Sequence, residues 1–222
     1  MDPSTTMDGD LTQDLLALVR SRGYERRAEP FALSSGGTSR DYVDLRRAVA
    51  RGADLELAGR AVAAALARRG VEFDAIGGMT MGADPVAHAV AMLTGRGWFS
   101  VRKAVKDHGR QQRIEGASLS PGVRVVVMED TVSTGRSMFE ALEVVRESGA
   151  EVVAACTILD RGEDIAPKVE SLGVPYVAVL TYRDLGIEPI GDGSSGSSPD
   201  GGASSPNGGA SSPSSSASSP NQ

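Results

Sequence analysis

The alternation of short apolar runs with amphipathic stretches is the feature that most constrains how this chain can fold. The runs VRVVVMED (123–130) and EVVAACTILD (151–160) are apolar at nearly every position, as expected of strands buried on both faces. Helical patterns separate such runs, for example DPVAHAVAMLTG (84–95) and SMFEALEVVRESG (137–149). Strands that alternate with helices through short loops predict an α/β fold with a central, mostly parallel sheet flanked by helices.

The composition divides the chain into three segments. Residues 1–10 are polar and acidic, so we expect a disordered N-terminus, and residues 11–191 carry the folded domain. The first helix of that domain is expected to begin at a cap on Asp10 and to end at Gly23. Residues 192–222 are almost entirely Gly, Ser, Pro, Ala, Asn and Asp, and they bury too little apolar surface to fold, so we expect a disordered tail.

Charge and aromatic content exclude several classes of function. The net charge is -6, and only 4% of the residues are aromatic, so we expect no nucleic-acid partner. No apolar stretch approaches the roughly 18 residues that span a bilayer, and the N-terminus does not resemble a signal peptide. With a single cysteine, Cys156, in an apolar run, the chain is expected to be a cytoplasmic protein that does not bind membranes.

Ligands of parallel α/β sheets bind beyond the carboxyl ends of the strands, so the residues that follow each strand are the candidates for a site. The segment IGGMTMGADP (76–85) is either a plain tight turn or an anion site before a helix. Arg161 follows another strand and is either an ordinary surface arginine or a fork that binds a carboxylate. Neither segment decides the function by itself.

A basic loop follows the strand GWFSVRK (97–103). Five fixed positive charges and one histidine fall within about a dozen residues, namely Arg102, Lys103, Lys106, His108, Arg110 and Arg113. The alternatives are a solvated charged loop and a site for a multiply charged anion. In an acidic protein, the position of this loop at a strand end favours the anion.

The segment EDTVSTGRS (129–137) follows the apolar strand. Buried, unpaired carboxylates are costly, so Glu129 and Asp130 are expected at the mouth of a site, with side chains that diverge. They can accept hydrogen bonds from sugar hydroxyls or help to hold Mg²⁺. The small polar residues from Thr131 to Ser137, followed by a helix start, can wrap a phosphate. Because no Walker motif is present, the pattern indicates a sugar phosphate rather than a nucleoside triphosphate.

These motifs together resemble a known family. FALSSGGTSRDYVDLR (31–46), GGMTMGADPVA (77–87), VRKAVKDHGRQQRIEG (101–116), MEDTVSTGRS (128–137), LDRGE (159–163) and DLGI (184–187) follow in the order seen in orotate phosphoribosyltransferases, which are type I phosphoribosyltransferases. The resemblance covers roughly residues 12 to 190 and implies that family's fold, with a small hood and a flexible catalytic loop. It also implies transfer of the phosphoribosyl group of 5-phosphoribosyl 1-diphosphate (PRPP) to orotate, giving orotidine 5′-monophosphate and diphosphate.

The resemblance further implies roles for individual residues. The catalytic residues would be Arg102, Lys103, Lys106 and His108, which would also bind the diphosphate. The rest of PRPP would be bound by Glu129, Asp130, Thr131, Val132, Ser133, Thr134, Gly135, Arg136 and Ser137. Ser133 and Arg161 would bind orotate, and residues 34–44 would form the hood.

The resemblance also implies a cofactor, an assembly and a local geometry. No residue is expected to bind metal directly: Mg²⁺ is expected to arrive with PRPP, and Glu129 and Asp130 could help to hold it through water. A homodimer would share its active sites across the interface, and Thr80-Met81 falls where the family often has a cis peptide bond.

Two departures keep alternatives open. Many relatives have a lysine at the positions of Ser34 and Met81, so two diphosphate contacts could be missing. The alternatives are a phosphoribosyltransferase for another nucleobase and a non-catalytic regulator that senses PRPP.

The sequence already generates one test. If the loop that contains Lys106 stabilises the leaving diphosphate, replacing Lys106 with Ala is expected to lower turnover strongly, by about a hundredfold or more, and to leave the fold intact. Steady-state kinetics and circular dichroism of the variant provide the check. Activity within about twofold of the unsubstituted protein would show that the assignment is wrong.

Overall fold

A computed structural model describes residues 3–33, 37–103 and 113–191 of the chain, with side chains from residue 10 onward. Its elements in chain order are α1 (Pro3–Leu18), η1 (Val19–Gly23, a π-helix), β1 (Tyr24–Ala32), β2 (Thr38–Val43), α2 (Leu45–Ala48), α3 (Gly52–Arg68), β3 (Ala75–Met79), α4 (Asp84–Thr94), β4 (Gly97–Val101), β5 (Ile114–Gly116), β6 (Arg124–Val132), α5 (Arg136–Glu147), β7 (Glu151–Asp160), α6 (Ile165–Glu170), β8 (Tyr176–Thr181) and α7 (Tyr182–Leu185).

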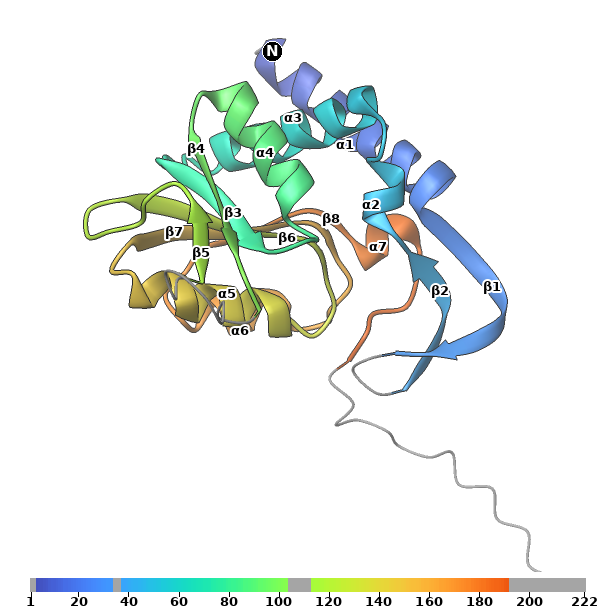
Figure 1. The fold of residues 1–222 in the computed structure, drawn as a ribbon. Coiled ribbons are helices and arrows are strands. Elements are labelled where there is room, and N and C mark those ends of the chain that lie inside the picture. Colours follow the sequence, from blue (N-terminus) through green and yellow to red (C-terminus); the bar gives the residue numbers. More distant parts are fainter. Residues whose placement is uncertain (1–2, 34–36, 104–112, 192–222) are drawn as a thin grey trace, which may run out of the picture.

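A six-stranded sheet with the order β5-β4-β3-β6-β7-β8 forms the centre of the molecule (Figure 1). Its strands run parallel, except that β5 is antiparallel to β4. The central, mostly parallel sheet expected from the alternation of strands and helices is therefore confirmed. Because the parallel strands all end at one edge, residues far apart in the sequence meet there.

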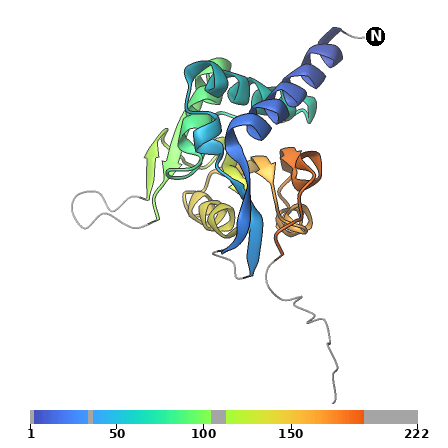
Figure 2. The same cartoon turned by 90° about the vertical axis from the view of Figure 1, so that its right-hand side faces the viewer.

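The two faces of the sheet bury two hydrophobic cores. On one face, Val126 and Met128 of β6 pack with residues of α1, α3 and α4. On the other face, Val125 and Val127 pack with residues of α5 and α6. Figures 1 and 2 show these helices above and below the sheet. Because successive side chains of a strand point to opposite faces, burial on both faces requires an uninterrupted apolar run, which is the pattern of residues 125–128.

The N-terminus differs from expectation. Helix α1 begins at Pro3, so the disorder expected for residues 1–10 is wrong for residues 3–10, and Asp10 lies within the helix instead of capping it. Adding turns to a helix that already exists costs less than nucleating one, which explains this extension. The helical stretch does end at Gly23, as expected. Neither α1 nor any other helix in the described part of the chain is both long enough and apolar enough to cross a membrane.

Strand β6 also continues further than expected. It runs through Glu129 and Asp130 to Val132, and Val132 is still in register with Asp160 of β7. The two acids therefore lie within a paired strand and not after its end. The pairing with β7 keeps this stretch in the strand conformation. Polar side chains do not end a strand whose backbone groups are hydrogen-bonded.

A small antiparallel sheet of β1 and β2 stands beside the main sheet (Figures 1 and 2). Strand β2 lies within residues 34–44, for which the resemblance implied a hood, whereas β1 precedes that stretch. We call β1 and β2 together the hood from here on. Residues 34–36, which include Ser34, lie outside the described residues. The tail at 192–222 also lies outside them, and its disorder stays a prediction.

Candidate functional site

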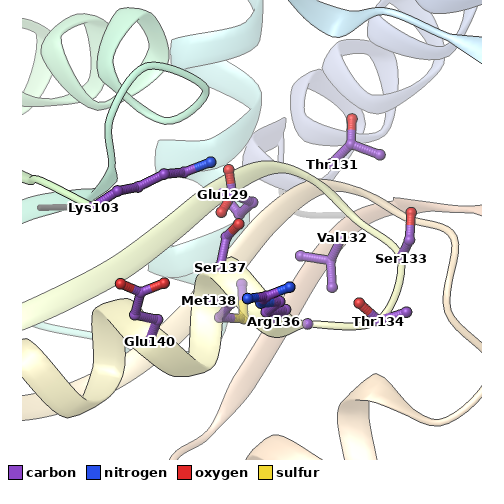
Figure 3. A pocket seen from close by; sticks show the side chains of 11 residues that line it. Lys103, Glu129, Thr131, Val132, Ser133, Thr134, Arg136, Ser137, Met138 and Glu140 are labelled. Atoms are coloured by element: carbon purple, nitrogen blue, oxygen red, sulfur yellow. The ribbon is translucent and has the colours of Figure 1, made fainter. Parts of the chain in front are cut away.

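A pocket of about 620 Å³ opens where β6 leaves the sheet (Figure 3). The residues that line it are Lys103, Glu129, Thr131, Val132, Ser133, Thr134, Gly135, Arg136, Ser137, Met138 and Glu140. Most of the residues that the sequence assigned to sugar-phosphate binding are in this set. Asp130 is the exception, and it borders the pocket beside Glu129.

The loop that forms the floor of the pocket turns at Gly135. This glycine has a φ of 79°, and a Cβ atom in its place would lie 2.5 Å from the ring of Phe139. Helix α5 starts at the next residue, and its first turn is closed by the Phe139 N–H, which donates to the Gly135 carbonyl at 2.8 Å. The positive end of the α5 dipole therefore faces the pocket, which suits a phosphate.

The carboxyl groups of Glu129 and Asp130 converge on Gly82. A Cβ atom on Gly82 would lie 2.9 Å from Oε1 of Glu129 and 2.9 Å from Oδ1 of Asp130. The expectation that these side chains diverge is therefore wrong. The absence of a side chain at Gly82 leaves the space into which both acids turn, so one ligand can meet both of them.

Burial raises the pKa values of both carboxyl groups in this acidic pair. Desolvation and the neighbouring Asp130 charge raise the pKa of Glu129 to about 8, whereas the positive charge of Lys103 acts in the opposite direction. Burial likewise raises the pKa of Asp130, and a hydrogen bond of 2.7 Å from the Thr131 N–H to its Oδ1 opposes that shift. Oε2 of Glu129 is buried without a hydrogen-bond partner, so this oxygen is available to a bound ligand.

The acidic pair fits a divalent cation only together with a substrate. Carboxylate oxygens are suitable Mg²⁺ ligands, and Mg²⁺ commonly keeps waters and phosphate oxygens in its shell. Among the described residues, no group of three or more His, Cys, Asp or Glu side chains could hold a metal ion. Oε2 of Glu129 has no hydrogen-bond partner and could meet such a cation, whose other ligands would be waters and substrate oxygens.

The cations of the basic loop separate into different environments. Lys103 lines the pocket, and its side chain extends toward Glu129 (Figure 3). Arg102 instead donates to Oε1 of Glu115 at 2.9 Å, on the edge strand. Arg113 pairs with Glu140 of α5 and donates to the Arg102 carbonyl at 3.0 Å. Lys106 and His108 lie outside the described residues, so Lys103 is the predicted catalytic cation that the described structure brings to the pocket.

The loop after β3 carries the expected backbone feature. The Thr80-Met81 peptide bond is cis, which confirms that prediction. Asp84 holds this loop, because it accepts hydrogen bonds from the Thr80 hydroxyl at 2.6 Å and from the Ser100 hydroxyl at 2.7 Å. The sequence analysis missed Asp84, although a carboxylate in the first turn of a helix after a glycine-rich loop was a usable signal.

Arg161 lies beside Ser133, as the sequence predicted. A Cβ atom on Gly162 would lie 2.4 Å from the Ser133 carbonyl oxygen, so the two segments touch. The Arg161 backbone N–H donates to the Val132 carbonyl at 2.7 Å. The residue is only 4% exposed, and Nε and Nη2 of its guanidinium have no hydrogen-bond partner. It is not an ordinary surface arginine, and its unmet donors suit a carboxylate.

Comparison with known proteins gives a consistent result. Residues 50–173 match the phosphoribosyl transferase domain family. The chain is 47% identical over 162 residues to an orotate phosphoribosyltransferase of Streptomyces avermitilis, covering 70% of this chain and 87% of that protein. Its fold is similar to the crystal structure of Mycobacterium tuberculosis orotate phosphoribosyltransferase in complex with Fe(III) dicitrate, with a TM-score of 0.69 and 39% identity over 80% of this chain and 99% of that one. The complex of the Mycobacterium tuberculosis enzyme with PRPP gives a TM-score of 0.65 at 37% identity, with the same coverage.

The raised pKa of Glu129 predicts how a substitution changes the pH dependence of stability. Below the ordinary pKa of 4.5 the carboxyl is protonated in both the folded and the unfolded protein. As the pH rises from 4.5 to about 8, the unfolded chain releases a proton that the folded protein keeps, so the free energy of unfolding falls. Glu129→Gln removes this loss, so its stability relative to the unsubstituted protein is expected to increase by on the order of 2 kcal/mol between pH 5 and pH 8.5.

Urea denaturation at several pH values measures this difference. Glu143, an exposed residue of α5, provides the control. Glu143→Gln is expected to give the same stability profile with pH as the unsubstituted protein. A Glu129→Gln profile parallel to that of the unsubstituted protein would contradict the assignment.

Proposed function

The chain belongs to the orotate phosphoribosyltransferase family, and we propose on this basis that it transfers the 5-phosphoribosyl group from PRPP to orotate. The products are orotidine 5′-monophosphate and diphosphate, which makes the protein a pentosyltransferase of pyrimidine nucleotide synthesis. The observation that carries the proposal is the buried Arg161, whose guanidinium has unmet donors next to a phosphate-binding loop. A nucleobase that bears a carboxylate satisfies those donors.

The site accommodates PRPP in one orientation. The 5′-phosphate binds to the loop from Thr131 to Ser137, at the positive end of α5. The ribose hydroxyls then lie at Glu129 and Asp130, which accept hydrogen bonds. The diphosphate extends toward Lys103 and the loop after β3, and the far side of the ribose faces Ser133 and Arg161, where orotate binds.

The reaction breaks the bond from C1 of the ribose to the diphosphate oxygen and forms a bond from C1 to N1 of orotate. N1 loses its proton, which passes to the departing diphosphate or to water. Positive charge develops on the ribose in an oxocarbenium-like transition state, and negative charge grows on the leaving diphosphate. Lys103 stabilises the leaving group, and Arg161 holds orotate by its carboxylate so that N1 faces C1. Glu129 and Asp130 would help to hold Mg²⁺ through water, and the ion would supply neutralisation of the charge on the diphosphate.

The proposal includes a homodimer. Met92 of α4 is 76% exposed, and Trp98 of β4 is 41% exposed with its ring packed edge-on against His88 at 4.4 Å between ring centroids. Large exposed apolar side chains of this kind favour an interface. These residues lie on α4 and β4, and β4 leads to Lys103 of the pocket, so we propose that the dimer holds its two active sites close to the interface. We also propose a cytoplasmic location, which suits a chain whose one cysteine is free and buried.

The two alternatives have less support. A purine or uracil has no carboxylate to accept the N–H groups of Arg161, which disfavours another nucleobase. A sensor would bind PRPP without turning over orotate, and the assay that follows separates it from the enzyme.

A direct assay tests the function. The protein is mixed with PRPP, Mg²⁺ and orotate, and the loss of orotate absorbance is followed; uracil, adenine and guanine are offered separately. Turnover of orotate alone is expected. Turnover of another base without orotate would show that the family member has a different substrate.

A substitution tests the role of Arg161. Arg161→Gln is expected to lower kcat/KM for orotate by about a hundredfold or more, because the substrate carboxylate loses a buried charged partner. Arg60→Gln is the matched control, since the Arg60 side chain is 55% exposed on α3 and is expected to be silent. Equal kinetics for Arg161→Gln and the unsubstituted protein would rule out carboxylate binding by Arg161.

A further inference from the structure

Glu140 is a carboxylate in a pocket that is otherwise suited to anions. It lines the pocket from the second turn of α5, and its negative charge repels the phosphate groups of the proposed substrate. The described side chains that line the pocket include two cations, Lys103 and Arg136, and two acids, Glu129 and Glu140. Sugar hydroxyls or a cation can meet Glu129 on β6, whereas Glu140 lies on the helix. A partner that cancels its charge is therefore required for anion binding.

Lys103 is the pocket cation that a free Glu140 carboxylate would attract. In Figure 3 the two side chains lie at the same end of the pocket, away from Ser133. A lysine ammonium group on its flexible stem readily reorients toward a nearby carboxylate. Such a pair would take from the diphosphate the cation that stabilises it in the proposed reaction.

Arg113 occupies the Glu140 carboxylate in place of Lys103. Nη2 of Arg113 donates to Oε1 of Glu140, and this ion pair joins the residue before β5 to helix α5. The side chains of the pair are 27% and 36% exposed, and ion pairs that solvent reaches in this way contribute little to the stability of a fold. The main effect of the pair is therefore on the charge that the pocket presents to a ligand.

Arg113 also holds the backbone that carries Lys103. Its Nε donates to the Arg102 carbonyl at 3.0 Å, and its Nη2 donates more weakly to the Lys103 carbonyl at 3.4 Å. The backbone carbonyl of Arg113 in turn accepts from the Arg102 N–H at 2.8 Å. One guanidinium is thus bonded both to the segment that presents Lys103 and to the acid that would compete for it.

We propose that Arg113 is a positioning residue for the diphosphate of PRPP: it occupies the Glu140 carboxylate and so keeps the Lys103 ammonium group available to the substrate. The proposal rests on the function proposed above, and it adds to the site a residue that acts through its neighbours. It has an asymmetric consequence. Loss of the arginine weakens PRPP binding, whereas loss of the glutamate does not.

A double-mutant cycle tests this asymmetry with Arg113→Gln, Glu140→Gln and the double variant. In Arg113→Gln the KM for PRPP is expected to rise about tenfold, because the uncovered carboxylate repels the phosphates and attracts Lys103. In Glu140→Gln it is expected to fall by about twofold, and in the double variant to lie within about threefold of the unsubstituted protein. Equal rises in both single variants, or a double variant as impaired as Arg113→Gln, would overturn the proposal.

Two further variants separate charge from shape. Glu143→Gln removes an exposed carboxylate one turn further along α5 and is expected not to rescue Arg113→Gln. Arg113→Lys keeps the charge but not the planar guanidinium, and its KM for PRPP is expected to lie closer to that of the unsubstituted protein than to that of Arg113→Gln. Rescue by Glu143→Gln would show that only the net charge of α5 matters, which would overturn the role of Glu140.

The dependence on salt gives a signature that a purely structural role would not produce. In Arg113→Gln the rise in the KM for PRPP is expected to diminish as salt is added, because salt screens the repulsion from Glu140. The KM for orotate is expected to change by less than about twofold. A defect that is equally large at all salt concentrations would contradict the proposal.

Calorimetric titration with diphosphate and Mg²⁺ makes the test independent of turnover. The dissociation constant of diphosphate is expected to rise about tenfold in Arg113→Gln and to recover in the double variant. If the unsubstituted protein binds diphosphate but does not turn over orotate, the proposed function fails while the titrations still report on Arg113. Equal affinities of the unsubstituted protein and Arg113→Gln would overturn the role of Arg113, whatever the base is.

Discussion

The cost of removing charge from water at the edge of the parallel sheet organises the rest of this structure. Strand β6 is apolar on both faces until it reaches Glu129, and the two carboxyl groups that follow are still largely buried. Such groups persist only where something compensates them. Lys103, the Thr131 N–H and the empty space at Gly82 do so in part, and a bound sugar phosphate with its cation would complete the compensation. The pocket thus lies where β6 carries buried carboxyl groups that the protein compensates only in part.

The main sheet and most of the site were predictable from the sequence because both depend on local patterns. Residues 151–160 were expected as a strand and form β7 with those bounds, and the pocket is lined by most of the residues from Glu129 to Ser137. The resemblance implied a hood only at residues 34–44, and β1 was not expected, since residues 24–32 are mostly polar and have no clear alternation. The burial of Asp41 could not be predicted, because its partners Tyr24 and Arg26 lie on β1, and the pairing of β1 with β2 was not expected from the sequence.

The partners of the residues in a charge run also could not be predicted from the sequence. The sequence groups Arg102, Lys103 and Arg113 as one basic loop, but the structure gives them different partners. Arg102 and Arg113 are neutralised by Glu115 and Glu140, and they fasten the base of the loop to the edge strand and to helix α5. Lys103 lies between them in the sequence but has a different environment, because it lines the pocket. A count of like charges cannot separate cations that hold the scaffold from those that meet a ligand, because the acids that pair with them come from other elements.

The two hydrogen bonds accepted by Asp84 have a mechanical consequence. One comes from Thr80, in the loop beside the acidic pair, and the other from Ser100, on the strand that continues to Lys103. The loop and the strand end are therefore clamped to one carboxylate at the start of α4. The two segments that we propose to contact the departing diphosphate are therefore held at a fixed spacing. A change at Asp84 would therefore alter the position of the Thr80 loop and of the end of β4 together.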